Sequence, residues 1–189
     1  RFDYSNLSSF LLSAVIHETT GMDTLSYARE NLFGPLGIDD VRWETSPQGI
    51  GVGWARMWLK PHDMAKFGML YLQKGQWDGQ QVVPAAWVEE SLTPHAFPKN
   101  YHDVLDENGE KDNQKSGENW VAMKFLRPIA DGYGYQWWLD KNGTYTALGT
   151  GGQYILVSPE ENLVVVVTSQ SSGLGVFKIA TLFDDYIRK

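Results

Sequence analysis

Cysteine is absent from the 189-residue chain. This absence excludes a disulfide framework, a thiolate metal site and a cysteine nucleophile, but it leaves the cellular compartment open. None of the 4 histidines belongs to a His-Glu-x-x-His pattern or has the spacing of a metal-ligand pair. We therefore predict no metal and no other cofactor.

Positive charge is also scarce. The chain has 16 Lys and Arg against 23 Asp and Glu, a net charge of −7, and no basic cluster. Binding to a phosphate backbone needs a concentrated positive surface, so a nucleic-acid partner is not expected. Alternating glycines at Gly49, Gly51 and Gly53 suggest a phosphate loop. The lysine and hydroxyl residue of such a loop do not follow, which argues against it.

Long apolar runs are missing as well. No stretch approaches the ~20 apolar residues that a membrane span requires, so none is expected in this chain. The first residues do not form a signal peptide, and the sequence leaves the localisation unknown. With 42% hydrophobic residues, the chain is nevertheless long enough for a sizeable folded core.

The first half of the chain is helical in character. Apolar spacing, proline starts and glycine stops predict helices over residues 7–20, 23–33, 60–74 and 84–92. The apolar face of the first helix comprises Leu7, Phe10, Leu11, Ala14 and Val15, and Ser5 or Asn6 fits its N-cap. We also expect a short strand over 39–46, an irregular stretch over 47–59 and a tight turn at 78–79.

The second half changes to strands. Residues 93–131 lack periodicity and predict a surface excursion. Four β-rich runs follow, joined by connections short enough for antiparallel hairpins. The apolar run "NLVVVV" predicts a central strand buried on both faces, and residues 175–189 predict an amphipathic helix packed across the sheet. The fold class is therefore α+β, with helices followed by an antiparallel meander and a C-terminal helix.

Two short stretches carry candidate functional residues. Tyr4 and Asn6 precede the first helix with a spacing that points both side chains the same way on an extended backbone. A phenol passes a proton when a nearby positive charge lowers its pKa, and an amide both donates and accepts hydrogen bonds. The alternative is a buried tyrosine beside a capping asparagine.

The second stretch surrounds Thr150 with glycines directly before a β-rich run. Glycines let a backbone approach a ligand closely, and exposed amides at such a place stabilise an oxyanion. The alternative is an ordinary glycine-rich hairpin turn.

Together the two stretches resemble a known superfamily. "FDYSNLSSFLLSAVIHETTG" is similar to the Tyr-x-Asn element and following helix of the serine β-lactamase and penicillin-binding-protein-like superfamily. Residues 28–44, 59–91, 133–140 and 147–170 are similar to its later helices and strands, in the family's order. The resemblance is strongest to class C β-lactamases, family VIII esterases and 6-aminohexanoate-dimer hydrolases. It implies a β-lactamase/transpeptidase-like fold.

The resemblance also implies roles for these residues. In the family, a Ser-x-x-Lys serine is acylated, a Tyr-x-Asn element relays protons and holds substrate, and a glycine-containing triplet lies on a strand. Tyr4 and Asn6 match the second element. The segment Thr150-Gly151-Gly152 matches the third as the substrate-binding triplet, with the Gln153 amide as an oxyanion donor. An alignment shifted by one residue makes Gly152 the donor instead.

Two departures from the family pattern shape the expectation. No serine of this chain has a lysine three residues later, so the nucleophile is missing. Residues 1–189 therefore resemble the C-terminal portion of one domain, which would need the missing N-terminal half as its partner. Thr150 stands where many members have lysine or histidine, so a cation for a substrate carboxylate is missing. That favours small ester or uncharged amide substrates over classical β-lactams.

The resemblance implies that this chain is part of a serine hydrolase that forms an acyl-enzyme. The chain alone is expected to be inactive. Tyr4, Asn6 and Thr150 are expected to converge on one cleft. The resemblance favours a periplasmic or secreted location, and a cytoplasmic one stays open. A non-catalytic relative that binds a ligand or peptidoglycan is the alternative.

A third alternative is a tryptophan-rich carbohydrate-binding domain. It needs a row of exposed aromatic side chains, whereas the adjacent Trp137 and Trp138 would point to opposite faces of a strand. Most of Trp54, Trp58, Trp137 and Trp138 are expected to belong to the core, and one or two of them are candidates for lining an apolar acyl pocket. We interpret His17, His62, His95 and His102 as structural or surface residues.

Overall fold

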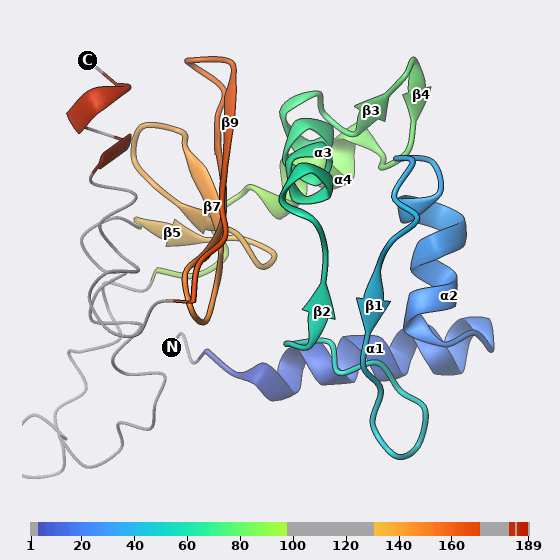
Figure 1. The fold of residues 1–189 in the computed structure, drawn as a ribbon. Helices are drawn as coiled ribbons and strands as arrows, with labels where there is room; N and C mark the ends of the chain where they lie inside the picture. The colour runs from blue at the N-terminus through green and yellow to red at the C-terminus, as the bar shows by residue number, and fades with distance from the viewer. Residues whose placement is uncertain (1–3, 98–130, 171–181, 184, 189) are drawn as a thin grey trace, which may run out of the picture. The chain divides into compact units, whose positions relative to one another are not determined.

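The structure is a computed structural model that describes residues 4–97, 131–170, 182–183 and 185–188. The described chain divides into an N-terminal unit, Tyr4–Ala85, and a C-terminal unit that begins at Ala86. In the N-terminal unit the elements are α1 (Asn6–Thr20), α2 (Thr24–Ala28), η1 (Arg29–Phe33), β1 (Arg42–Trp43), β2 (Met57–Trp58), α3 (Pro61–Leu72), β3 (Gln76–Trp77) and β4 (Gln80–Gln81). Helix α4 (Ala85–Ser91) then leads to β5 (Gly132–Tyr133), β6 (Trp138–Leu139), β7 (Tyr145–Gly149), β8 (Gln153–Ser158) and β9 (Leu163–Val167) (Figure 1).

The first helix begins and ends as the sequence predicts. Ser5 is the N-cap, with an extended backbone at φ −137° and ψ 125°, so Asn6 is the first helical residue. Gly21 takes the left-handed conformation at φ 70° and donates its N–H to the His17 carbonyl. Glycine is favoured at this position because it has no Cβ to clash.

The second helix has an unexpected end. The Asp23 carboxylate accepts the Ser26 N–H at 2.9 Å and caps α2. The chain then winds into the π-helical turn η1 before the Gly34-Pro35 break. The predicted helix over 23–33 is thus confirmed in extent, and only its last turn differs in hydrogen bonding.

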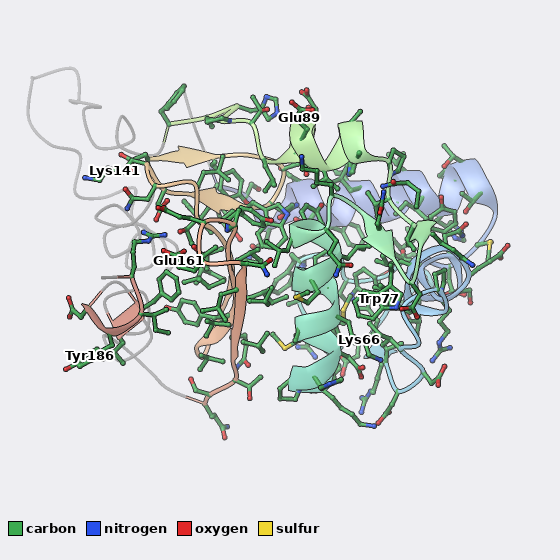
Figure 2. The ribbon with its side chains drawn as sticks, turned by 90° about the horizontal axis from the view of Figure 1, so that it is seen from above. Lys66, Trp77, Glu89, Lys141, Glu161 and Tyr186 are labelled. Carbon is green, nitrogen blue, oxygen red and sulfur yellow. The ribbon has the colours of Figure 1, made fainter. Side chains whose placement is uncertain are left out.

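The core of the N-terminal unit lies between η1, the following turn and α3. Its fully buried members are apolar: Phe33, Leu36, Ile38, Val41 and Leu70. An ion pair also lies against this region, with Lys66 Nζ 3.0 Å from Asp63 Oδ1 and 2.6 Å from the Gly37 carbonyl oxygen. Lys66 and Trp77 mark α3 and β3 of this unit in Figure 2. The contact of Lys66 with Gly37 therefore joins α3 to the turn that ends the second helical segment.

Two short hairpins complete the N-terminal unit. β3 and β4 are joined by Asp78 at φ 47° and Gly79 at φ 77°, which confirms the predicted tight turn. β1 pairs antiparallel with β2, so the predicted strand over 39–46 is real but shorter. Its partner comes from the end of the stretch that the sequence predicted to be irregular.

The C-terminal unit contains the predicted meander. Its sheet has the order β5-β6-β7-β8-β9, and every neighbouring pair is antiparallel. The run "YGYQWWLD" forms two strands rather than one, because Gly134 to Gln136 turn the chain between β5 and β6. β8 is the most buried strand, with Tyr154 and Val157 fully enclosed. Burial raises the pKa of the Tyr154 phenol to about 12.

The expectation for "NLVVVV" is wrong. β9 was predicted to be a central strand buried on both faces, but within the described residues it lies at the edge of the sheet. All five of its residues are only half-buried. The buried strand is β8, in which all residues from Tyr154 to Ser158 are buried although the strand begins and ends with a polar residue. The run of valines therefore indicates that the segment forms a strand, but not that the strand is buried.

The described end of the chain is held by one arginine. Arg188 contacts Asp140 at 3.2 Å, Glu161 at 3.4 Å and the hydroxyl of Thr144. Glu161, which is labelled in Figure 2, lies in the turn between β8 and β9. Most of the predicted C-terminal helix, 175–189, and of the excursion 93–131 lies outside the described residues. None of the helices that the structure describes is long and apolar enough to cross a membrane.

Candidate functional site

Tyr4 and Asn6 flank the N-cap of α1 in the N-terminal unit. Ser5 between them is extended, which is the backbone that directs neighbours two residues apart to the same side. Tyr4 and Asn6 are both half-buried. Ser5 makes no side-chain capping bond, and Asn6 lies inside the helix. Asn6 is therefore not the capping residue that the simpler interpretation requires.

Burial changes the acidity of Tyr4. The loss of solvent raises the pKa of its phenol above the usual value of 10.0. At neutral pH the hydroxyl is therefore protonated in this chain and able to donate a proton. A nearby cation would be needed to bring this pKa down to a value suited to a base.

The glycine-rich stretch between β1 and β2 rests directly on α1. A Cβ added at Gly53 would lie 2.3 Å from the Ser9 carbonyl oxygen and 2.7 Å from Ser13 Oγ. One at Gly51 would lie 2.9 Å from Thr24 Oγ1. These glycines permit close backbone packing, which explains their alternation without a phosphate ligand.

This contact has a defined side on α1. Asn6, Ser9 and Ser13 follow one another at intervals of three and four residues, so they share one face of the helix. The loop at Gly53 covers this face one to two turns after Asn6. Sequence reasoning missed this contact, although the alternating glycines were a visible signal for it.

The second group of candidate residues forms the turn between β7 and β8 in the C-terminal unit. Gly149 pairs with Gln153, and the Gly152 N–H donates to the Gly149 carbonyl oxygen at 3.2 Å. Gly151 and Gly152 have φ of 86° and 91°, values that side chains strongly disfavour. Thr150 is exposed at the tip of this turn.

The turn is attached to the chain that follows β9. Gln153 Nε2 donates to the Ser169 carbonyl oxygen at 2.5 Å. Ser169 Oγ donates to the Gly151 carbonyl oxygen at 2.6 Å and lies 3.3 Å from that of Gly152. No sequence pattern pointed to Ser169, which follows an apolar strand.

The structure thus brings the predicted residues together in two groups. Tyr4 and Asn6 belong to the N-terminal unit, and Thr150, Gly151, Gly152 and Gln153 share one turn of the C-terminal unit. Among the described residues, no three His, Asp or Glu side chains are grouped as metal ligands.

The weaker candidates are placed as follows. His17 Nδ1 lies 3.2 Å from the Met22 carbonyl oxygen, a local contact at the end of α1. His62 is exposed on α3. His95 stacks on Tyr135 at 4.4 Å, and His102 lies outside the described residues. None of the three described histidines touches the candidate residues in these contacts, so their structural interpretation stands.

The tryptophans divide into two kinds. Trp137 and Trp138 are 3% and 6% exposed, so they belong to the core and cannot form a carbohydrate platform. Trp54 and Trp58 are about half exposed in the loop and strand next to α1, and Arg42 lies 4.7 Å from the Trp58 ring centre. Trp54 and Trp58 are therefore the ones of these four available to a ligand.

The described elements, in which helix α1 is followed later in the chain by an antiparallel meander, match the β-lactamase/transpeptidase fold of solved relatives. The chain belongs to the β-lactamase family, whose model matches residues 1–184.

Individual relatives agree with this assignment. The 6-aminohexanoate-dimer hydrolase of Paenarthrobacter ureafaciens is 23% identical over 172 residues, which cover 89% of this chain and 39% of the relative. A penicillin-binding protein homologue from Pyrococcus abyssi, an octamer, superposes with a TM-score of 0.68 at 19% identity over 100% of this chain and 43% of its own. A β-lactamase from Mycobacterium bovis gives a TM-score of 0.63 at 18% identity, over 98% and 65%. The chain spans about two fifths of the length of the curated relative.

Proposed function

We propose that this chain is the C-terminal portion of a serine hydrolase that works through an acyl-enzyme. The observation that carries the proposal is the Tyr-x-Asn element at the start of α1, in a chain that matches the β-lactamase family over residues 1–184. The nucleophile of the proposed enzyme is a serine of a Ser-x-x-Lys element upstream of residue 1, because no such element occurs within this chain.

The reaction proceeds in two balanced steps. In the first, the serine oxygen bonds to the substrate carbonyl carbon, the serine proton passes to the Lys and Tyr4 pair, and the leaving alcohol or amine receives a proton as its bond breaks. In the second, water attacks the acyl-serine ester and releases the acid and the free serine. Tyr4 serves as the proton relay, and Asn6 holds the substrate amide or carbonyl and the lysine.

The Tyr4 environment supports a role that depends on the missing portion. Burial alone raises the pKa of Tyr4, so its phenol stays protonated. A lysine ammonium placed beside the phenol would lower this pKa again, because opposite charges stabilise the phenolate. The relay therefore forms only when the lysine-bearing segment is present.

The glycine turn supplies the oxyanion site in this proposal. The N–H of Gln153 is the proposed donor to the tetrahedral intermediate. The alternative donor, the N–H of Gly152, already donates to Gly149 within the turn at 3.2 Å. Gln153 is likewise paired with Gly149, in the β7–β8 ladder, so these contacts favour neither candidate donor over the other.

The upstream portion also has a surface to cover. Side chains along one side of α1 are more than half exposed although they are apolar, and they are Leu7, Leu11, Leu12 and Val15. Three of them belong to the face that the sequence predicts to pack inward. Contiguous exposed apolar patches mark interaction sites. Since the match covers only 39% of the curated relative, we assign this face to the nucleophile-bearing portion of the same domain.

The proposed substrate preference follows from Thr150, at the tip of the turn between β7 and β8. Thr150 is exposed and uncharged, so it offers no cation to a substrate carboxylate. The proposed substrates are small esters and uncharged amides. A relative named 6-aminohexanoate-dimer hydrolase is consistent with amide cleavage on this fold. A non-catalytic binding protein of the same family is the competing function, and it is distinguished by the absence of acylation.

Turnover of a nitrophenyl ester tests the proposal. The product of the complete gene is expected to hydrolyse nitrophenyl acetate or butyrate well above background, whereas residues 1–189 alone show no turnover. Substitution of the upstream Ser-x-x-Lys serine by alanine is the matched control and should abolish the reaction. Turnover by this chain alone that depends on Tyr4, or an active serine variant, would contradict the proposal.

A further inference from the structure

We infer that Ser169 is a positioning residue that orients the two peptide groups carrying the candidate oxyanion donors. This inference rests on the proposed function and adds to it a residue outside the family's three elements. Ser169 is half-buried, and it follows β9 rather than lying in the glycine turn.

The register of the sheet explains how Ser169 reaches the turn. β8 and β9 pair antiparallel, with Tyr154 opposite Val167. Continuing the same register by two residues places Gly152 opposite Ser169. The β8–β9 hydrogen-bond ladder has ended at this position. The Ser169 hydroxyl contacts the carbonyl oxygens of Gly151 and Gly152 in place of the backbone N–H that a continuing strand would provide.

The contact is reciprocal. Ser169 Oγ donates to the Gly151 carbonyl oxygen at 2.6 Å, and the Ser169 carbonyl oxygen accepts from Gln153 Nε2 at 2.5 Å. A Cβ added at Gly151 would lie 3.6 Å from that same carbonyl oxygen, in ordinary contact. The turn is therefore attached to the segment after β9 through both the backbone and the side chain of one residue.

The position of the hydroxyl determines where the candidate donors point. In a trans peptide the C=O and the following N–H point in opposite directions. Ser169 Oγ lies within 2.6 Å and 3.3 Å of the carbonyl oxygens of Gly151 and Gly152. The N–H groups of Gly152 and Gln153 must then point away from Ser169. The hydroxyl donates its single proton to the Gly151 carbonyl oxygen and lies beside that of Gly152, so it holds the first peptide group by a hydrogen bond and restricts the second by contact.

Positive backbone angles make this support necessary. Gly151 and Gly152 both lie in the left-handed region, at φ 86° and 91°. Glycine samples many other conformations at little cost, so two adjacent glycines do not hold peptide planes by themselves. An oxyanion donor acts through fixed orientation, because it must not reorganise as charge develops. Loss of the hydroxyl should therefore reduce kcat and leave KM almost unchanged.

The test uses the complete gene product and three variants. Ser169→Ala removes the hydroxyl, Ser169→Thr retains it, and Thr168→Ala changes an exposed neighbour for which no contact with the turn is seen. Steady-state kinetics on a nitrophenyl ester give kcat and KM. Amide hydrogen exchange, followed by mass spectrometry on a peptide covering residues 149–154, reports the order of the turn without requiring activity.

We expect Ser169→Ala to lower kcat by ~10- to 100-fold, since misplacing a catalytic group by about 1 Å can cost this much. Its KM should stay within about twofold, the 149–154 peptide should exchange faster, and Ser169→Thr should restore most of kcat. Unchanged kcat, unchanged exchange, or an equal loss in Thr168→Ala would overturn the inference. An inactive wild-type protein would refute the proposed function, and the exchange result alone would then decide the role of Ser169.

Discussion

Replacing Tyr4 by phenylalanine is expected to lower kcat/KM of the complete enzyme by ~10²- to 10⁴-fold, the range that a general acid or base contributes. The substitution removes only the hydroxyl and keeps the ring. Tyr4 is half-buried, so phenylalanine fits the same space without a cavity. The loss should appear in acylation, because the phenol is proposed to carry the serine proton toward the leaving group.

Tyr27→Phe is the matched control for this substitution. Tyr27 is also a half-buried tyrosine of the N-terminal unit, but it lies in α2 and not at the Tyr-x-Asn element. Its variant should retain wild-type kinetics. A Tyr4→Phe enzyme within about threefold of wild type would remove Tyr4 from the reaction.

The second large effect is expected on stability, from Gly53→Ala. The new Cβ would lie 2.3 Å from the Ser9 carbonyl oxygen and 2.7 Å from Ser13 Oγ, so either the loop or α1 must move. Gly53 also has a positive φ of 31°. Overpacking and backbone strain together should lower the free energy of unfolding by about 3 kcal/mol. Urea unfolding of the 189-residue chain measures this change.

The variant Gly49→Ala separates the effect of overpacking from the effect of backbone strain. Gly49 lies in the same loop at φ 82°, but a Cβ there would meet nothing within 4 Å. Its replacement should therefore show only the backbone penalty, about 1 kcal/mol. Equal losses in the two variants would contradict the close packing of the loop on α1.

Local signals predicted most of the fold. Gly21 as a helix stop and Asp78-Gly79 as a hairpin turn are decided by neighbours in sequence, and each was confirmed. The burial of β9 was mispredicted because burial depends on which strand lies alongside. The π-helical end of α2 likewise has no signature within its own residues.

The same distinction between local patterns and distant contacts applies to the candidate site. Tyr4, Asn6 and the turn around Thr150 were visible as patterns, because their chemistry lies in residue types at short spacing. Ser169 and the packing of Gly53 on α1 were not, because each depends on a partner 16 to 44 residues away in sequence. Contacts between residues far apart in sequence are therefore not predicted from the sequence, even where the candidate residues themselves are recognisable.

Labelling of the complete gene product with a fluorophosphonate probe, followed by peptide mapping, tests whether the acylated serine lies upstream of this chain. We expect one labelled serine, located upstream of residue 1 in a Ser-x-x-Lys sequence, and no labelling of the 189-residue chain alone. A labelled serine within residues 1–189, or a complete protein that takes up no label while it is folded, would contradict this expectation.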